Sequence, residues 1–169
     1  SSAWNNFATA LKRESHTELA VKAFTEALKI EDDPLVWANY SGMYVNQADP
    51  DRCIELADEC LKRAPYQAQA GNHKALALLE KGDYEQGFAW YNSRLRLEEF
   101  HNRQYPGPMW DGGRVGTLVV HGEQGVGDEI MFCSLLPEVL KRVDRVVIEC
   151  VGKLVTVFER SFGVPCYPD

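Results

Sequence analysis

The amino-acid sequence predicts a mainly α fold in two parts: three helical hairpins over residues 1–100, and a small three-stranded parallel α/β unit over residues 117–169. Three observations lead to this prediction. Apolar residues recur at helical spacing through the first part, and their pattern repeats along the chain. The periodicity is lost over residues 101–116, which form a linker rich in Gly and Pro. From residue 117 onwards, short apolar runs alternate with helical patterns, as in parallel α/β sheets.

The first two hairpins are predicted by positions that match at one constant offset, with the spacing of one helix face. In the first helix of each hairpin these positions hold Trp4, Phe7, Ala8 and Leu11, matched by Trp37, Tyr40, Ser41 and Tyr44. In the second helix they hold Ala20, Ala23, Phe24, Ala27 and Leu28, matched by Cys53, Leu56, Ala57, Cys60 and Leu61. Ser15 with Glu18 predicts a capping box ahead of the second helix in the first hairpin. Asp49 followed by Pro50 predicts the corresponding helix start in the second hairpin.

The third hairpin follows the pattern more loosely. Its first helix is predicted from the apolar residues Ala75, Leu76, Leu78 and Leu79. Asp83 with Gln86 predicts a cap for a second helix, which we expect to continue to about Phe100.

This period and this pattern of aromatic and small residues resemble the tetratricopeptide repeat, although Gly71 and Lys74 replace the usual large apolar residues in the third unit. The resemblance implies a right-handed stack of hairpins with a concave face that binds a protein or peptide. Asn6 and Asn39 are separated by the same offset, and they resemble the asparagine ladder with which some repeat proteins hold a peptide backbone. The alternative is that these two residues are exposed amides without a role.

Composition limits the other partners. A formal charge of −7 argues against nucleic acid and against an anionic membrane surface. No apolar run approaches the roughly 20 residues of a membrane span, and no signal-peptide pattern precedes the first helix, so we expect a cytoplasmic protein. The five cysteines form no CxxC pair, so we expect buried reduced thiols and no metal site. Composition predicts no oligomeric state.

The second part reads as strand, helix, strand, helix, strand. The predicted elements are Thr117–His121, Asp128–Arg142 with a possible kink or break at Pro137, Arg145–Val151, Lys153–Phe162 and Val164–Tyr167. The second strand is apolar on both faces, as in a buried parallel sheet. Ligands of such sheets bind beyond the carboxyl ends of the strands, where a glycine-rich turn follows the first strand.

We predict that this turn is a ligand-binding loop. Its residues are Gly122, Glu123, Gln124, Gly125, Gly127 and Glu129, with Asp128 and the strand-end His121 as candidate catalytic residues. Glycines permit positive φ and allow a ligand to approach the backbone. The loop differs from a P-loop because no Lys-Ser/Thr follows, and from a dinucleotide fingerprint because Ile130 replaces the third glycine. A dinucleotide site stays an alternative because Glu149 lies where a ribose-binding acid is expected.

The acidic character of the loop favours proton acceptance from a sugar hydroxyl over phosphate binding. Residues 122–129, followed by Phe132 and Leu136-Pro137, resemble the first loop of bacterial GT-B glycosyltransferase-like proteins fused behind tetratricopeptide repeats. The flanking matches are residues 87–96, 110–112 and 146–150. In the related heptosyltransferases a Gly-Asp in this loop provides the proposed catalytic base, which corresponds to Asp128. The alternatives are that Asp128 is an N-cap or a first-turn acid that complements the helix dipole, and that His121 is structural.

The resemblance also implies a limit. A GT-B enzyme has two Rossmann-like domains, and the second holds most nucleotide-sugar contacts, whereas residues 117–169 correspond to half of the first. We therefore expect an interaction scaffold with an incomplete, truncated glycosyltransferase-like domain that is inactive alone and has no cofactor. A nucleotide-sugar donor is expected only if a second domain is supplied. The alternatives are the acceptor-side fragment of a GT-B glycosyltransferase and a dinucleotide-binding unit.

Overall fold

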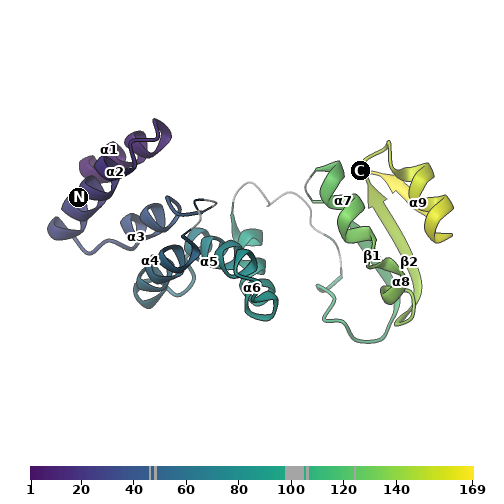
Figure 1. Ribbon diagram of the computed structural model, residues 1–169. Coiled ribbons are helices and arrows are strands. Elements are labelled where there is room, and N and C mark those ends of the chain that lie inside the picture. Colours follow the sequence, from purple (N-terminus) through teal and green to yellow (C-terminus); the bar gives the residue numbers. More distant parts are fainter. Residues whose placement is uncertain (46, 48, 98–104, 106, 124) are drawn as a thin grey trace. The chain divides into compact units, whose positions relative to one another are not determined.

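The computed structural model spans residues 1–169 and describes all of them except 46, 48, 98–104, 106 and 124 (Figure 1). The chain divides into two compact units, Ser1–Asn102 and Arg103–Asp169. Each unit has a hydrophobic core of its own. The first unit consists of helical hairpins and the second contains a three-stranded parallel sheet, so the predicted fold class is confirmed.

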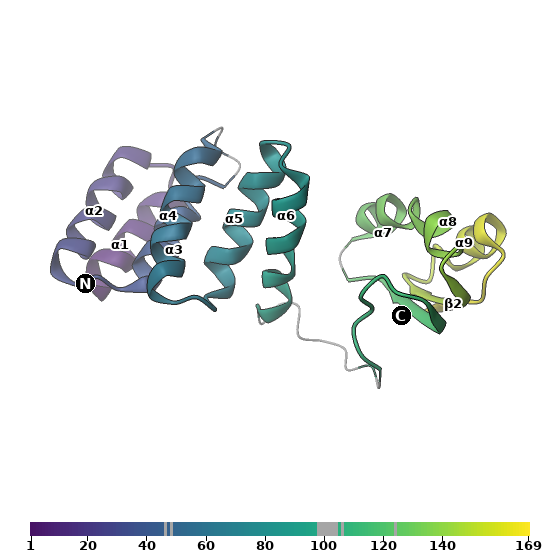
Figure 2. The ribbon, with the colours of Figure 1, turned by 90° about the horizontal axis from the view of Figure 1, so that it is seen from below.

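The helical unit is a row of three hairpins that lie side by side (Figure 2). Their helices are α1 (Ser2–Arg13), α2 (Thr17–Ile30), α3 (Pro34–Ser41), α4 (Pro50–Arg63), α5 (Ala68–Glu80) and α6 (Tyr84–Tyr91). A 3₁₀ helix, η1 (Asn92–Arg96), continues from α6. The second helix of the third hairpin is therefore shorter as an α-helix than the sequence predicts, and residues 98–100 of that prediction lie outside the described residues.

Two of the three predicted helix starts have the expected side-chain caps. The Asp49 carboxylate accepts the Arg52 backbone N–H at 3.1 Å, and the Asp83 carboxylate accepts the Gln86 backbone N–H at 3.2 Å. Each bond satisfies a donor that the first turn of a helix leaves unpaired.

The capping box predicted at Ser15 is wrong. Helix α2 begins at Thr17 with His16 as its N-cap, and no side chain caps it. Ser15 instead has a φ of 61°, because it forms the tight turn that connects α1 to α2.

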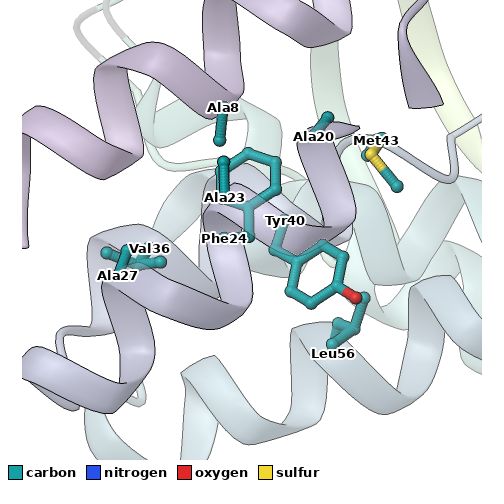
Figure 3. Packing of buried hydrophobic residues seen from close by; sticks show 9 residues of the cluster. All are labelled: Ala8, Ala20, Ala23, Phe24, Ala27, Val36, Tyr40, Met43 and Leu56. Atoms are coloured by element: carbon teal, nitrogen blue, oxygen red, sulfur yellow. The ribbon is translucent and has the colours of Figure 1, made fainter. Parts of the chain in front are cut away.

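The contact between the first two hairpins is aromatic. The Phe24 ring of α2 stacks on the Tyr40 ring of α3, with centroids 5.1 Å apart and an angle of 18° between the planes (Figure 3). Both side chains are buried, and the small residues Ala20, Ala23 and Ala27 of α2 are buried around them. Small side chains at these positions allow the helices to approach closely enough for the rings to stack.

In the third hairpin, Gly71 stands where the repeat usually has a large apolar residue, and α5 lies close to α6 and η1 at this point. A Cβ atom on Gly71 of α5 would lie 2.4 Å from Ser93 Oγ and 3.5 Å from the Trp90 ring. Trp90 of α6 thus lies beside the position where the repeat usually has its own large apolar residue. The departure from the repeat pattern at Gly71 is explained by this approach.

A polar contact connects α3 to α5 inside the unit. Ser41 Oγ donates to the Ala38 carbonyl at 2.8 Å and lies 2.9 Å from His73 Nδ1. Burial, together with the nearby Lys12 ammonium, lowers the pKa of His73 to about 4. A Cβ atom on Gly42 would lie 2.5 Å from the His73 ring, so a side chain at position 42 would displace the imidazole.

The sheet of the second unit has the order β1-β2-β3 with all strands parallel. The strands are β1 (Val115–His121), β2 (Val143–Cys150) and β3 (Cys166–Pro168), and the helices are α7 (Val126–Cys133), α8 (Leu136–Val139) and α9 (Val155–Phe162). All three helices lie on one face of the sheet (Figure 2). Their buried side chains form one core with alternate residues of β2 (Val146, Ile148 and Cys150).

The helix expected over Asp128–Arg142 is broken into α7 and α8 near Pro137, where the sequence predicts a kink or break. Pro137 lies in the first turn of α8 and cannot continue the α7 hydrogen-bond pattern. One prediction for this unit needs correction, because the second strand is not buried on both faces. Arg145 is exposed and Val147 is partly exposed, since no described helix covers that side of the sheet.

Candidate functional site

The predicted ligand loop connects β1 to α7 at the carboxyl edge of the sheet. Gln124 lies outside the described residues. Gly122, Gly125 and Gly127 all avoid the left-handed region, since the positive-φ glycines of the described chain lie elsewhere. These three glycines therefore do not use the positive φ that glycine permits.

Gly122 is explained by Glu129, which is only 7 % exposed. A Cβ atom on Gly122 would lie 2.4 Å from Glu129 Oε1, so only glycine leaves room for this carboxylate. The Glu129 carboxylate accepts the Val151 backbone N–H at 3.0 Å, and Gly122 donates its own N–H to the Glu149 carbonyl at 2.9 Å. Both predicted loop residues thus fix the start of α7 to the end of β2.

Asp128 lies in the first turn of α7. Gly125 is the N-cap, and its carbonyl accepts the Asp128 backbone N–H at 2.9 Å, so Asp128 is a first-turn acid of α7 and not its N-cap. The Asp128 side chain is partly buried, and within the described part of the chain its carboxylate makes no hydrogen bond or ion pair. The helix dipole stabilises negative charge at this position. Asp128 therefore presents an acceptor that the described residues leave available.

A second group of side chains lies at the same strand ends. The ring of Tyr105 stacks on the ring of His121, with centroids 4.6 Å apart and an interplanar angle of 24°. The Tyr105 hydroxyl donates to the Glu149 carboxylate, and Glu149 is the register partner of His121 across β1 and β2. His121 Nδ1 lies 3.2 Å from the Gly122 carbonyl. The structure thus places His121 with Tyr105 and Glu149, and no hydrogen bond joins it to Asp128.

Tyr105 could not be found from the sequence. It belongs to a segment without periodicity that precedes the first strand, and no spacing rule connects its position to that of His121. An aromatic ring, an imidazole and a carboxylate at one sheet edge form an arrangement that can stack on a sugar or base and accept its hydroxyl protons.

The amide ladder predicted on the repeats has a different member. The Asn39 amide donates to Asn5 Oδ1 at 3.1 Å, and the Gln69 amide lies 3.5 Å from Asn39 Oδ1. Asn5 is buried, whereas Asn6 is exposed. The ladder therefore consists of Asn5, Asn39 and Gln69, on the three first helices α1, α3 and α5. The sequence comparison missed Asn5 because the offset that matches the apolar positions pairs Asn39 with Asn6, one residue away from the bonded partner.

The cysteines are buried and reduced, as predicted. No three His, Cys, Asp or Glu side chains come together to hold a metal ion in the part of the chain that the structure describes. In that same part, no helix combines the length and the apolar character needed to cross a membrane.

The hairpin geometry and the aromatic and small-residue contacts define a tetratricopeptide-type helical repeat. Residues 1–34, which contain the first hairpin, match the tetratricopeptide repeat family. The chain as a whole is similar to protein FlbA of Caulobacter vibrioides, with 25 % identity over 203 aligned residues. The match covers 94 % of this chain and 34 % of FlbA, so the chain spans about a third of the length of that relative. The glycosyltransferase resemblance stays a prediction.

Proposed function

We propose that the helical unit is a protein-interaction scaffold that holds an extended peptide along α1, α3 and α5. The observation that carries this proposal is the ladder of Asn5, Asn39 and Gln69, one amide from each first helix. A side-chain amide has two donors and two acceptor lone pairs, so Asn39 retains bonding capacity beyond its bonds to the other two. Amides at this spacing suit the alternating N–H and C=O groups of a peptide backbone.

The ladder is tested by selecting peptides from a random displayed library against the whole chain and measuring their affinity by calorimetry. Asn39→Ala should weaken the selected peptides about tenfold, since a lost hydrogen bond in a partly buried site costs about 1–2 kcal/mol. Asn6→Ala is the matched control because Asn6 is exposed and outside the ladder. Failure to select any peptide, or equal binding to the Asn39→Ala variant, would contradict the proposal.

A second candidate function belongs to the α/β unit: the acceptor side of a GT-B-like glycosyltransferase. Its support is the Asp128 carboxylate, which has no partner among the described residues and lies at the carboxyl edge of a parallel sheet. Asp128 would take the proton of an acceptor hydroxyl while the hydroxyl oxygen forms a bond to the sugar carbon and the nucleoside diphosphate leaves. The nucleotide-sugar donor would be held by a second domain.

The test uses a longer protein in which such a domain follows this chain. Asp128→Asn should lower sugar transfer by about 10²–10⁴-fold, the usual effect of removing a general base. Glu159→Gln, on an exposed acid of α9, should leave most of the transfer intact. Transfer that survives Asp128→Asn would exclude this residue as the base.

The dinucleotide alternative has less support. The Glu149 carboxylate, its expected ribose acceptor, already receives the Tyr105 hydroxyl. The space beside Gly122, through which a pyrophosphate would approach, is filled by the Glu129 carboxylate.

A further inference from the structure

The charges of the helical unit are unevenly divided between the two helices of each hairpin. Within these fully described helices, the first helices α1, α3 and α5 together carry three basic side chains and one acid, Glu80 at the end of α5. The second helices α2, α4 and α6 carry seven acids and five basic side chains. The chain has a formal charge of −7, so the first helices, which bear the amide ladder, are its locally basic part.

One of these basic side chains lies on the same face of α1 as the ladder. Lys12 follows Asn5 by seven residues, which is close to two full turns, so both side chains leave the helix on the same side. Side chains on a helix lean toward its N-terminus, so the Lys12 ammonium is directed back toward the level of the ladder.

The position of His73 shows how far Lys12 extends across the first helices. Burial and then the Lys12 ammonium lower the pKa of His73, so the two side chains lie near each other although they belong to α1 and α5. His73 follows Gln69, the ladder residue of α5, by about one turn. The Lys12 charge is therefore located beside the ladder, where a peptide that crosses all three first helices can reach it.

The charge of Lys12 has no partner within the described part of the chain. Its side chain is partly buried, and its ammonium makes no hydrogen bond or ion pair with any described residue. The groups that act on it are Arg13 and the Cys53 thiol, and burial raises the pKa of Cys53 to about 12, so neither supplies a negative charge at pH 7. Lys74 of α5, in contrast, is paired with Asp58 at 2.6 Å. A partly buried cation of this kind is stabilised by an anion that binds beside it.

We propose that the peptide held along α1, α3 and α5 is acidic, and that Lys12 pairs with one of its carboxylates. This inference rests on the proposed scaffold function and names the chemical class of its partner. A hydrogen bond between an ammonium and a carboxylate is stronger than the neutral amide bonds of the ladder. The ladder thus binds the backbone of the peptide, whatever its sequence, and Lys12 selects peptides that carry an acid at one position.

Peptides selected from the random library against the whole chain test this inference. The peptides that bind should be enriched in Asp or Glu relative to the starting library. Lys12→Met, which keeps the aliphatic part of the side chain, should weaken them about tenfold. The loss should become smaller as the salt concentration rises, because the pair is partly exposed. Lys22→Met, at an exposed position on α2, is the matched control and should bind like the original chain.

A double-mutant cycle identifies the carboxylate. Replacement of the selected acid by its amide should weaken binding to the original chain about as much as Lys12→Met does, and should have little further effect on the Lys12→Met variant. Synthetic peptides with free and amidated C-termini show whether the carboxylate belongs to a side chain or to the terminus, and either result supports the proposal.

The possible failures separate this inference from the scaffold proposal. If Asn39→Ala weakens the selected peptides but all their acids can be replaced without loss, the inference is overturned and the scaffold stands. Equal binding to the original chain and to Lys12→Met has the same meaning. Failure to select any peptide overturns the scaffold, and the inference with it. Circular dichroism checks that each variant keeps its helical content, and Lys12→Gln gives the same comparison if Lys12→Met unfolds the unit.

Discussion

Acidification should destabilise the helical unit through one buried imidazole, His73. Its pKa in the folded chain is about 4, against 6.5 for an unperturbed histidine. Between these values the unfolded chain binds a proton that the folded chain does not, so the free energy of unfolding falls as the pH falls. The two pKa values differ by about 2.5 units, and each unit is worth about 1.36 kcal/mol. Full protonation of the unfolded chain therefore lowers the free energy of unfolding by about 3 kcal/mol. The loss begins near pH 6.5 and is complete near pH 4.

The neighbouring charges allow this effect to be isolated. The carboxylates with lowered pKa values include Asp32, which is exposed, and Glu59, which is partly exposed, and their ion pairs are lost only below their ordinary pKa values of about 4. Urea unfolding, followed by circular dichroism between about pH 6.5 and 5, therefore reports mainly on His73. His73→Asn can keep the contact to Ser41 without titrating, and should remove most of the slope.

His16→Asn is the matched control, because His16 is exposed at the N-cap of α2 and should leave the slope unchanged. Equal pH dependence in the original chain and in His73→Asn would refute the reasoning. So would a stability that rises on acidification through this range.

Three further substitutions test the packing. Gly71→Ala should lower the free energy of unfolding by about 1–3 kcal/mol in thermal unfolding, because the new methyl group overlaps Ser93 Oγ. A second substitution, Ser93→Gly, should restore much of this loss. Glu129→Ala should lower the melting temperature by removing the acceptor of the Val151 N–H, a loss of about 1–3 kcal/mol, whereas Glu129→Gln should cost less because its amide oxygen can still accept. Asp83→Ala should cost about 1 kcal/mol in urea unfolding by removing the cap of α6; no change would show that α6 starts without it.

The repeated hairpins were predictable from the sequence because each pair of helices meets the same packing requirement. Tyr40 repeats Phe7, and Cys53 and Cys60 repeat Ala20 and Ala27, all at one offset that can be read without coordinates. The ladder shows the limit of this approach. The offset pairs Asn39 with Asn6 as equivalent positions, but it does not show that the Asn39 side chain bonds to Asn5, one residue earlier.

The candidate site was less predictable, because its contacts join distant positions. An acid beside glycines suggests a ligand loop, but Glu129 is held by a backbone donor 22 residues later in the chain. Tyr105 reaches Glu149 over 44 residues from a segment with no regular pattern. Neither pairing follows from local propensity, so the sequence points to a loop at this edge of the sheet without predicting which of its acids already have partners.

The bond between the Glu129 carboxylate and the Val151 N–H has a consequence for the neighbouring Asp128. It closes a loop of the chain and connects the first turn of α7 directly to the backbone at the end of β2. The orientation of that turn is then set before any ligand arrives. On the glycosyltransferase proposal, a molecule that binds at Asp128 would lose less conformational entropy than one that must first order its site, so a larger part of its contact energy would appear as affinity. Glu129 would then contribute to that affinity without touching the ligand, because it fixes the position of its neighbour.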